Sequence, residues 1–315
     1  MTVLGGVIGV DLGGTKILAR HVDPASGKAT GREKVPTPKD GPEVVLEMVA
    51  KTARKLDGFK DAATVGIGVP GFVVDHSVVL RCPNIVGWDS PVDVGAILSK
   101  ELGKTVVVAN DVNCGAVAEY RYGAGSEVND MLAVFVGTGV GGGLVLDGQL
   151  RAGRSGTAGE IGHLTVVPNG RVCGCGGRGH LEAYAGRAGI DRQAKALAAA
   201  GRRNALADLA GGSMVKSRHI ERALKEGDEV AQELIEDAVK ALAQAIGNVG
   251  TILDLKHAVL GGGVVDKLGQ GFVDQITASS AFGGFEPSDI KLVLADRLDD
   301  AGVLGAAVLA ADQYL

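Results

Sequence analysis

Three features that this sequence lacks limit its class before any motif is considered. Aromatic residues make up only 3% of the 315 residues, so valine, alanine, leucine and isoleucine must fill the core that a hydrophobic content of 46% makes possible. The net charge is −5 and no basic block occurs, which argues against a nucleic-acid surface. The 4 cysteines are too few for a disulfide framework in a chain of this length, so we expect them to be free, metal-bound or catalytic.

No segment resembles a targeting signal or a membrane span. Residues 1–14 carry no basic n-region, and the longest uncharged stretch, residues 131–146, is shorter than a membrane span and rich in glycine. We therefore expect a soluble, cytoplasmic protein without a membrane or nucleic-acid partner.

Glycine is abundant, with 50 residues, and two glycine clusters follow short apolar runs. Residues 7–11 lead into "GGTK" and a second strand at 17–22, and the pattern restarts in "MLAVFVGTGVGGGLVLDGQL" (131–150). Two α/β units, each opening with a glycine-cornered hairpin, are therefore predicted. Further strands are expected at 32–35, 63–71, 105–110, 257–263 and 289–295, and helices at 41–56, 91–102, 111–122, 217–225, 228–253 and 302–312.

The glycine hairpins point to phosphate binding by an uncommon route. No Walker motif is present, and the G-x-G-x-x-G formed by Gly137, Gly139 and Gly142 continues as a strand instead of opening a helix, which excludes a Rossmann site. Backbone N–H groups in tight turns can bind anions, so one hairpin per domain would clamp a nucleotide's phosphates in the cleft between them. The alternative is that both are simply tight hairpins.

Six motifs, in order along nearly the whole chain, resemble those of the ROK family of sugar kinases and repressors. They are "VDLGGTK" (10–16), "VAND" (108–111), "VGTGVGGGL" (136–144), "GEIGH" (159–163), "CGCGGRGHLE" (173–182) and "LGGG" (260–263). The resemblance implies an α/β, actin-like ATPase fold (ribonuclease H-like and duplicated), with two domains and a cleft between them. We expect residues 1–110 plus about 300–315 in a small domain and 111–299 in a large domain that contains a zinc loop.

The resemblance implies ATP and Mg²⁺ as cofactors. Asp11 would hold the magnesium of Mg–ATP, and Gly13, Gly14, Thr15 and Lys16 would lie near the phosphates. Gly137, Thr138 and Gly139 would touch phosphate from the other domain, and Gly261 and Gly262 would let adenosine lie against the backbone. Lys16 could equally be a solvated strand residue.

The same resemblance assigns the sugar site. Asp111, at the end of a strand, would be the general base that accepts a proton from the sugar hydroxyl. Gly71, Asn84, Asn110, Glu160, His163 and Glu182 would bind the sugar. The alternatives are an N-cap for Asp111, turn positions for Asn84 and Asn110, and solvated surface charges for the two glutamates.

Two cysteines and two histidines give four ligands of the kind that zinc prefers, although the C-x-C spacing alone is weak evidence. The family binds zinc through one histidine and three cysteines, and His180 stands here at the third cysteine position. We predict a closed, structural Zn²⁺ site of His163, Cys173, Cys175 and His180. The alternative is a glycine-rich surface loop without metal. Cys82 and Cys114 are expected to be packing residues.

The activity implied is transfer of the ATP γ-phosphoryl group to the 6-hydroxyl of glucose. Other kinase substrates stay open, namely mannose, fructose or N-acetylmannosamine, as does polyphosphate as donor. A sugar-sensing regulator without turnover is the alternative from another class. The first strand is expected almost at the start of the sequence, which leaves no room for the repressors' DNA-binding domain. The family suggests a homodimer or homotetramer.

Overall fold

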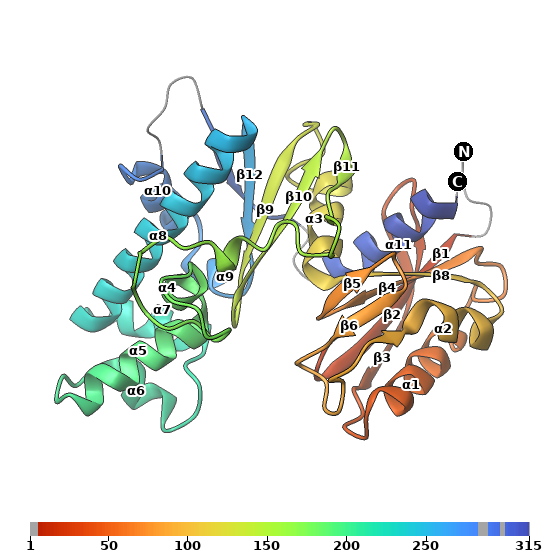
Figure 1. Ribbon diagram of the computed structural model, residues 1–315, viewed down its shortest axis with the longest axis horizontal. Coiled ribbons are helices and arrows are strands. Elements are labelled where there is room, and N and C mark those ends of the chain that lie inside the picture. The colour runs from red at the N-terminus through yellow and green to blue at the C-terminus, as the bar shows by residue number, and fades with distance from the viewer. Residues whose placement is uncertain (1–5, 283–288, 297–299, 315) are drawn as a thin grey trace. The chain divides into compact units, whose positions relative to one another are not determined.

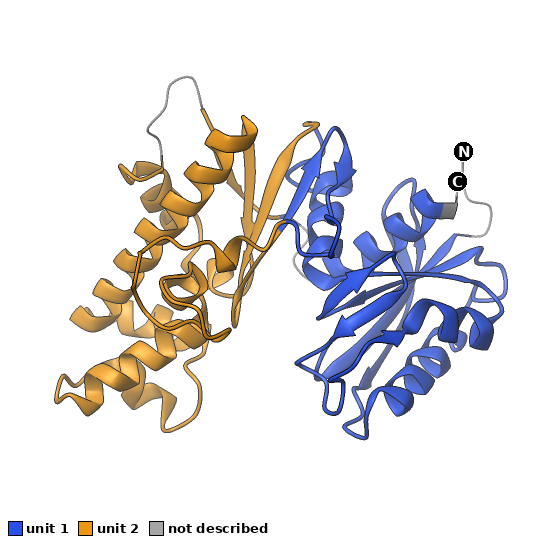
Figure 2. Cartoon of the chain, in the orientation of Figure 1, with its two compact units in different colours: residues 1–127, 143–158, 296–315 blue, residues 128–142, 159–295 orange. Residues whose placement is uncertain are grey.

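The structure, a computed structural model, describes residues 6–282, 289–296 and 300–314. The chain forms two compact units (Figure 2): unit 1 comprises residues 1–127, 143–158 and 296–315, and unit 2 comprises residues 128–142 and 159–295. This grouping differs from the boundary expected at residue 110. Helix α3 (Asp111–Tyr122) belongs to unit 1 because it packs against the C-terminal helix α11 (Ala301–Tyr314).

Unit 1 is built on a five-stranded sheet of order β3-β2-β1-β4-β8. Its first three strands form the predicted antiparallel meander, and the last two run parallel to β1. The strands predicted from the apolar runs are all present: β1 (Val7–Leu12), β2 (Lys16–Asp23), β3 (Lys28–Pro36), β4 (Thr64–Val69) and β8 (Thr105–Asn110).

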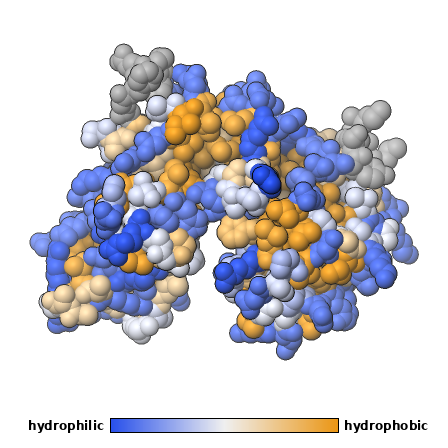
Figure 3. Space-filling model, viewed as in Figure 1, coloured by the Kyte–Doolittle hydropathy of each residue, from blue (hydrophilic) through white to orange (hydrophobic). Residues whose placement is uncertain are grey.

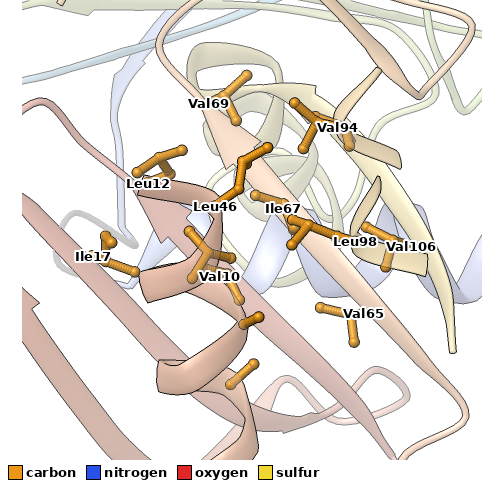
Figure 4. Close-up of a cluster of buried hydrophobic side chains, with 14 of the residues drawn as sticks. Val10, Leu12, Ile17, Leu46, Val65, Ile67, Val69, Val94, Leu98 and Val106 are labelled. Carbon is orange, nitrogen blue, oxygen red and sulfur yellow. The ribbon is translucent and has the colours of Figure 1, made fainter. Parts of the chain in front are cut away.

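Alternation of side chains along the strands gives this sheet two covered faces. Helices α1 (Pro42–Arg54) and α2 (Val94–Leu102) cover one face, and α11 and α3 cover the other (Figure 1). The first face holds an aliphatic core, as the low aromatic content predicted. Figure 4 shows part of it: Val10, Leu12, Ile17, Leu46, Val65, Ile67, Val69, Val94, Leu98 and Val106.

Helix α11 lies against the sheet at very short range. A β-carbon on Gly66 of β4 would collide with the backbone of Ala306, and one on Gly305 would collide with the backbone of Cys114 in α3. Glycine at these positions therefore lets three elements approach backbone to backbone.

The buried Glu119 of α3 fastens two distant segments of unit 1. It has 0% exposure, and its Oε2 accepts hydrogen bonds from the backbone N–H groups of Ala124 (3.1 Å) and Asp296 (3.0 Å). Residues 124 and 296 flank points where the chain leaves unit 1 and returns to it.

Unit 1 also carries a small antiparallel sheet of β5 (Phe72–Val74), β6 (Val78–Arg81) and β7 (Val92–Asp93).

Unit 2 contains most of a second sheet, of order β11-β10-β9-β12-β13. Its strands are β9 (Met131–Val136), β10 (Val140–Leu146), β11 (Gln149–Leu150), β12 (His257–Gly261) and β13 (Lys291–Leu294), and residues 143–158, with β11, belong to unit 1. The long helix α8 (Glu229–Leu253) was predicted to start at residue 228. It begins one residue later, and the Asp228 side chain caps it. The other helices are η1 (Ile161–His163), α4 (Glu182–Ala185), α5 (Arg187–Ala199), α6 (Ala205–Ala210), α7 (Ser217–Lys225), α9 (Val265–Leu268) and α10 (Gln270–Ala278).

The surface is mixed in character. On the face shown in Figure 3, hydrophilic residues are interspersed with smaller hydrophobic areas. Among the described residues, no helix combines the length and apolar character needed to cross a membrane.

Candidate functional site

Asp11 and Asp111 lie at the ends of parallel strands in unit 1. Asp11 of β1 pairs in register with Gly68 of β4, which pairs with Ala109 of β8, and Asp111 follows β8 as the first residue of α3. The carboxyl ends of parallel strands meet at one edge of a sheet, where ligands bind in α/β folds. A β-carbon on Gly68 would lie 3.2 Å from the Cys114 Sγ and 3.7 Å from the Cα of Asp111, so Gly68 lies directly beside the first turn of α3.

Asn110 caps helix α3. Its Oδ1 accepts hydrogen bonds from the N–H groups of Val112 (2.9 Å) and Asn113 (3.1 Å), and its Nδ2 donates to the carbonyl oxygen of Gly71 (3.0 Å). The alternative N-cap at Asp111 is therefore wrong by one residue, because Asn110 is the last residue with extended backbone. Asn110 and Gly71 hold each other in place, and sugar binding by either stays a prediction.

Two buried cysteines flank Asp111. Burial, reinforced by the negative charge of Asp111, raises the pKa of the Cys82 thiol to about 12. Burial also raises the pKa of Cys114 well above its usual range, with further contributions from Asp111 and Asp11. Both thiols are fully enclosed, which agrees with the predicted packing role.

Asp11 has the surroundings of a cation ligand. Burial raises the pKa of its carboxyl, and the positive charge of Lys16 opposes this only in part. A raised pKa means that the ionised carboxylate lacks full compensation, and Mg²⁺ prefers oxygen ligands of this kind. A β-carbon on Gly302, in the first turn of α11, would lie 3.2 Å from the Asp11 Cγ. The residues present therefore fit magnesium at Asp11.

The first glycine turn, residues 13–16, is held by a residue that the sequence did not single out. Thr37 donates from its hydroxyl to the carbonyl oxygen of Gly13 (2.6 Å) and from its N–H to that of Thr15 (3.2 Å). A β-carbon on Gly14 would lie 2.6 Å from the carbonyl oxygen of Asn84. The structure thus brings the predicted phosphate turn and the predicted sugar loop of unit 1 into contact.

The four predicted zinc ligands lie together in unit 2. The ligand atoms of His163, Cys173, Cys175 and His180 all lie within 4.8 Å of one another. The Cys175 Sγ is 3.2 Å from His180 Nδ1, and the Cys173 Sγ is 4.0 Å from His163 Nδ1. Tetrahedral zinc, with bonds of about 2.3 Å to sulfur and about 2.0 Å to nitrogen, places such atoms about 3.5 Å apart. The donor set and its spacing therefore fit zinc, with no ligand position left open.

Contacts outside the four ligands also fix the zinc loop, and the sequence did not reveal them. The Arg171 Nη2 lies 2.5 Å from the Asp237 Oδ2 of α8, and the guanidinium carbon lies 4.6 Å from the centre of the Tyr184 ring. The Tyr184 hydroxyl in turn accepts a hydrogen bond from the Arg171 N–H at 3.0 Å. The loop is therefore joined to α4 and α8 by protein contacts alone.

Three predicted sugar ligands surround this cluster. The His163 Nε2 faces the Glu160 Oε2 at 3.8 Å while its Nδ1 faces Cys173, so the two ring nitrogens have separate neighbours. The Cys173 Sγ lies 3.4 Å from the Glu182 Oε1. Burial raises the pKa of Glu160, an effect that His163 opposes and Glu182 increases. The two glutamates are therefore close enough to interact.

Glu182 also reaches the second glycine turn. Its Oε2 accepts a hydrogen bond from the Val140 N–H at 3.2 Å, and a β-carbon on Gly139 would collide with the same oxygen. The turn at residues 137–139 thus lies directly beside a predicted sugar ligand.

Gly261 ends β12, and Gly262 follows with a left-handed φ of 95° against the backbone of Val136. Glycine permits both the angle and the close approach.

Comparison with known proteins identifies the family of this chain. The family model described as "ROK family" matches residues 7–313. A glucokinase from Streptomyces coelicolor is 33% identical over 315 residues, covering 98% of both chains. An N-acetylmannosamine kinase from Escherichia fergusonii is 34% identical over 311 residues, covering 98% of this chain and 99% of that protein.

A solved structure extends the likeness to three dimensions. The ROK family glucokinase from Streptomyces griseus, in complex with glucose and AMPPNP, has a TM-score of 0.78 and 36% identity, with 97% of this chain and 99% of that chain covered. The fold is the actin-like, mixed α/β fold of these sugar kinases, and the chain belongs to the ROK family.

Proposed function

We propose that this chain is an ATP-dependent glucokinase that transfers the γ-phosphoryl group of ATP to the 6-hydroxyl of glucose. The position of Asp111 is the observation that carries the proposal. Its carboxylate stands at a strand end, at the first position of α3, with one oxygen accepting the Val112 N–H at 2.9 Å. A base at this place can accept a hydroxyl proton while the scaffold stays fixed.

The reaction needs little covalent chemistry from the protein. As the sugar oxygen bonds to the γ-phosphorus, its proton passes to the Asp111 carboxylate, and the bond to the β-phosphate oxygen breaks to release ADP. Magnesium, when bound at Asp11, supplies positive charge to the phosphates. Each glycine turn would contribute backbone N–H groups to phosphate binding.

The sugar ligands proposed here are Glu160, His163 and Glu182 of unit 2 and Asn84 of unit 1. Carboxylates suit a sugar because each can accept several hydroxyl hydrogen bonds. Zinc at the four-ligand cluster would be structural, because a closed site has no position for substrate. It would fix His163 and hold the loop segment of Cys173, which lies beside Glu182.

N-acetylmannosamine is the second candidate substrate. A kinase for that sugar matches this chain at 34% identity, level with the 33% of the glucokinase from Streptomyces coelicolor. The same carboxylates could hold either sugar, so residue types alone do not separate the two substrates.

An ADP-release assay across glucose, mannose, fructose and N-acetylmannosamine tests the proposal, with ATP or polyphosphate as donor. We expect the highest kcat/KM for glucose with ATP. A higher value for N-acetylmannosamine would transfer the assignment to that substrate. ATP consumption with none of the sugars, together with measurable sugar binding, would favour the non-catalytic regulator.

A further inference from the structure

Arg187 is the first residue of α5, and it makes two hydrogen bonds to the second glycine turn, while Ala188 makes a third. Its Nη2 donates a hydrogen bond to the Thr138 hydroxyl at 2.7 Å. Its backbone N–H donates to the Gly137 carbonyl oxygen at 3.1 Å, and the next residue, Ala188, donates to that of Thr138 at 2.9 Å. The start of α5 and the 137–139 turn therefore form one continuous structure.

The same guanidinium reaches toward the other predicted nucleotide segment of unit 2. Its Nη1 lies 3.5 Å from the Ser217 hydroxyl, at the start of α7. A β-carbon on Gly263, the last glycine of "LGGG", would lie 3.7 Å from that hydroxyl. Arg187 thus extends from the turn predicted for phosphate toward Gly263, which directly follows the glycines predicted for adenosine.

The hydrogen bonding of Arg187 is incomplete without a ligand. A guanidinium has five N–H donors in a planar fork that suits carboxylate or phosphate. Here its side-chain acceptors are two neutral hydroxyls, its Nε is buried without an acceptor, and no ion pair found among the described residues includes it. A partly buried cation in this state is short of an anion.

We propose that Arg187 binds the phosphates of the nucleotide, exchanging its hydroxyl partners for phosphate oxygens. This inference rests on the proposed function, since it assumes that the phosphates of ATP lie at the 137–139 turn. The turn itself contains no charged residue, and the carboxylate of Glu182 lies against it. Arg187 supplies positive charge at this turn, where the phosphates of the nucleotide would bind.

The test is to measure nucleotide affinity in Arg187→Met, with Arg192→Met as the matched control. Arg192 is exposed on the same helix. Calorimetry with ATP, ADP, adenosine and glucose separates the phosphates from the rest of the ligand. We expect Arg187→Met to weaken ATP and ADP binding at least tenfold while adenosine and glucose affinities stay within about twofold, and Arg192→Met to change none of them.

Equal losses for ATP and adenosine, or none, would overturn the proposal and leave Arg187 as a clamp on the turn. If Arg187→Met does not fold, Arg187→Lys and Ser217→Ala decide. If Arg187 binds phosphate, Arg187→Lys keeps the charge and should still bind ATP more tightly than adenosine. Ser217→Ala should then leave ATP affinity nearly unchanged. A clamp predicts that Ser217→Ala weakens ATP and adenosine alike.

The wild-type protein distinguishes this inference from the proposed function. If the wild type phosphorylates a sugar while Arg187→Met keeps its ATP affinity, only the role of Arg187 is wrong. If the wild type binds no nucleotide, even with glucose present, both are wrong.

Discussion

Each unit sets two carboxylates beside two cysteines, and the cysteines have opposite surroundings. In unit 1, Cys82 and Cys114 are enclosed in the core, and burial raises the pKa of both thiols, with a smaller contribution from the charge of Asp111. In unit 2, Cys173 and Cys175 lie with two histidines in a loop, and Cys173 lies 3.4 Å from Glu182. One pair packs, and the other has the geometry of metal ligands.

The difference follows from what holds each pair of carboxylates. Asp11 and Asp111 end strands of a regular sheet, whose backbone ladder already fixes them. Glu160 and Glu182 flank a loop that contains one turn of 3₁₀ helix and two isolated bridges, so side-chain contacts must replace the ladder. A strand of a regular sheet positions a carboxylate through its backbone hydrogen bonds and packing. An irregular loop needs additional side-chain contacts to do the same.

The largest expected effect is the loss of chemistry without loss of structure. Asp111→Asn keeps the size of the side chain and the cap at Asn110, but removes the base. We expect kcat to fall by about 10²- to 10⁴-fold, with Tm and glucose affinity nearly unchanged. Steady-state kinetics beside thermal unfolding checks this, and retention of more than about a tenth of kcat would show that Asp111 is not the base.

The loop of unit 2 should behave in the opposite way. Cys175→Ser replaces a thiolate by a poor zinc ligand, so we expect loss of the metal, a lower Tm and glucose affinity weakened by about 10- to 100-fold. Cys82→Ser is the matched control, because Cys82 is a buried residue of unit 1 whose thiol donates to the Pro70 carbonyl oxygen, so its loss should leave one zinc per chain. Metal analysis with glucose titration decides, and a Cys175→Ser protein that keeps its zinc would show that Cys175 is not a ligand.

The contact between Glu182 and the glycine turn can be separated from nucleotide binding by two alanine substitutions. A β-carbon at Gly137 meets nothing within 4 Å, whereas one at Gly139 collides with Glu182. Gly137→Ala should therefore weaken ATP binding by about tenfold through steric hindrance alone, without affecting glucose. Gly139→Ala should weaken both ligands. Unchanged ATP affinity in Gly137→Ala would place the phosphates elsewhere.

A smaller effect is expected on the stability of unit 1. Burial raises the pKa of Asp11, so the fold favours its protonated form, and this contribution is lost as pH rises through the raised pKa. In metal-free protein at pH 7, Asp11→Asn should raise Tm by about 2–4 °C while weakening Mg–ATP binding. The gain should vanish below about pH 3.9, where the carboxyl is protonated in both states. Thermal unfolding at both pH values with EDTA tests this.

The smallest change is expected at His180. Both a neutral imidazole and a thiolate bind zinc well, so His180→Cys should keep one zinc per chain and change glucose affinity by less than about twofold. His180→Ala is the contrasting variant and should lose the metal. If His180→Ala retains both zinc and glucose affinity, His180 is not a ligand, despite its position 3.2 Å from Cys175.

The sequence was informative where function depends on local pattern. Alternation and glycine turns predicted both hairpins, and the family resemblance carried by "EIGH" and "CGCGGRGHLE" implied four ligands that the structure indeed clusters. Partners far apart in the chain could not be read in this way. Glu119 accepts the N–H of a residue 177 positions later, and Arg171 pairs with Asp237, 66 positions away. Such pairs depend on tertiary packing, which no local period encodes.

Arg187 is an intermediate case. It lies five residues after Glu182, the last residue of the motif "CGCGGRGHLE". Nothing in the sequence, however, distinguishes an arginine whose side chain hydrogen-bonds to Thr138 from one that lies in solvent. Thr37 is similar, because its hydrogen bonds to the first turn depend on the pairing of β2 with β3. The clustering of the four zinc-type ligands was predictable from the motifs, whereas contacts such as those of Thr37 and Arg187 were not.

The close approach of α11 to the sheet bears on how mutational data for this protein should be interpreted. Gly66 and Gly305 cannot accept even a methyl group without moving backbone, so a saturation library selected for activity should be depleted there as strongly as at Asp111. Neither glycine is among the residues assigned to sugar or nucleotide. Intolerance to substitution therefore identifies two different populations of sites in this chain, and only a measurement of folded protein alongside activity separates them.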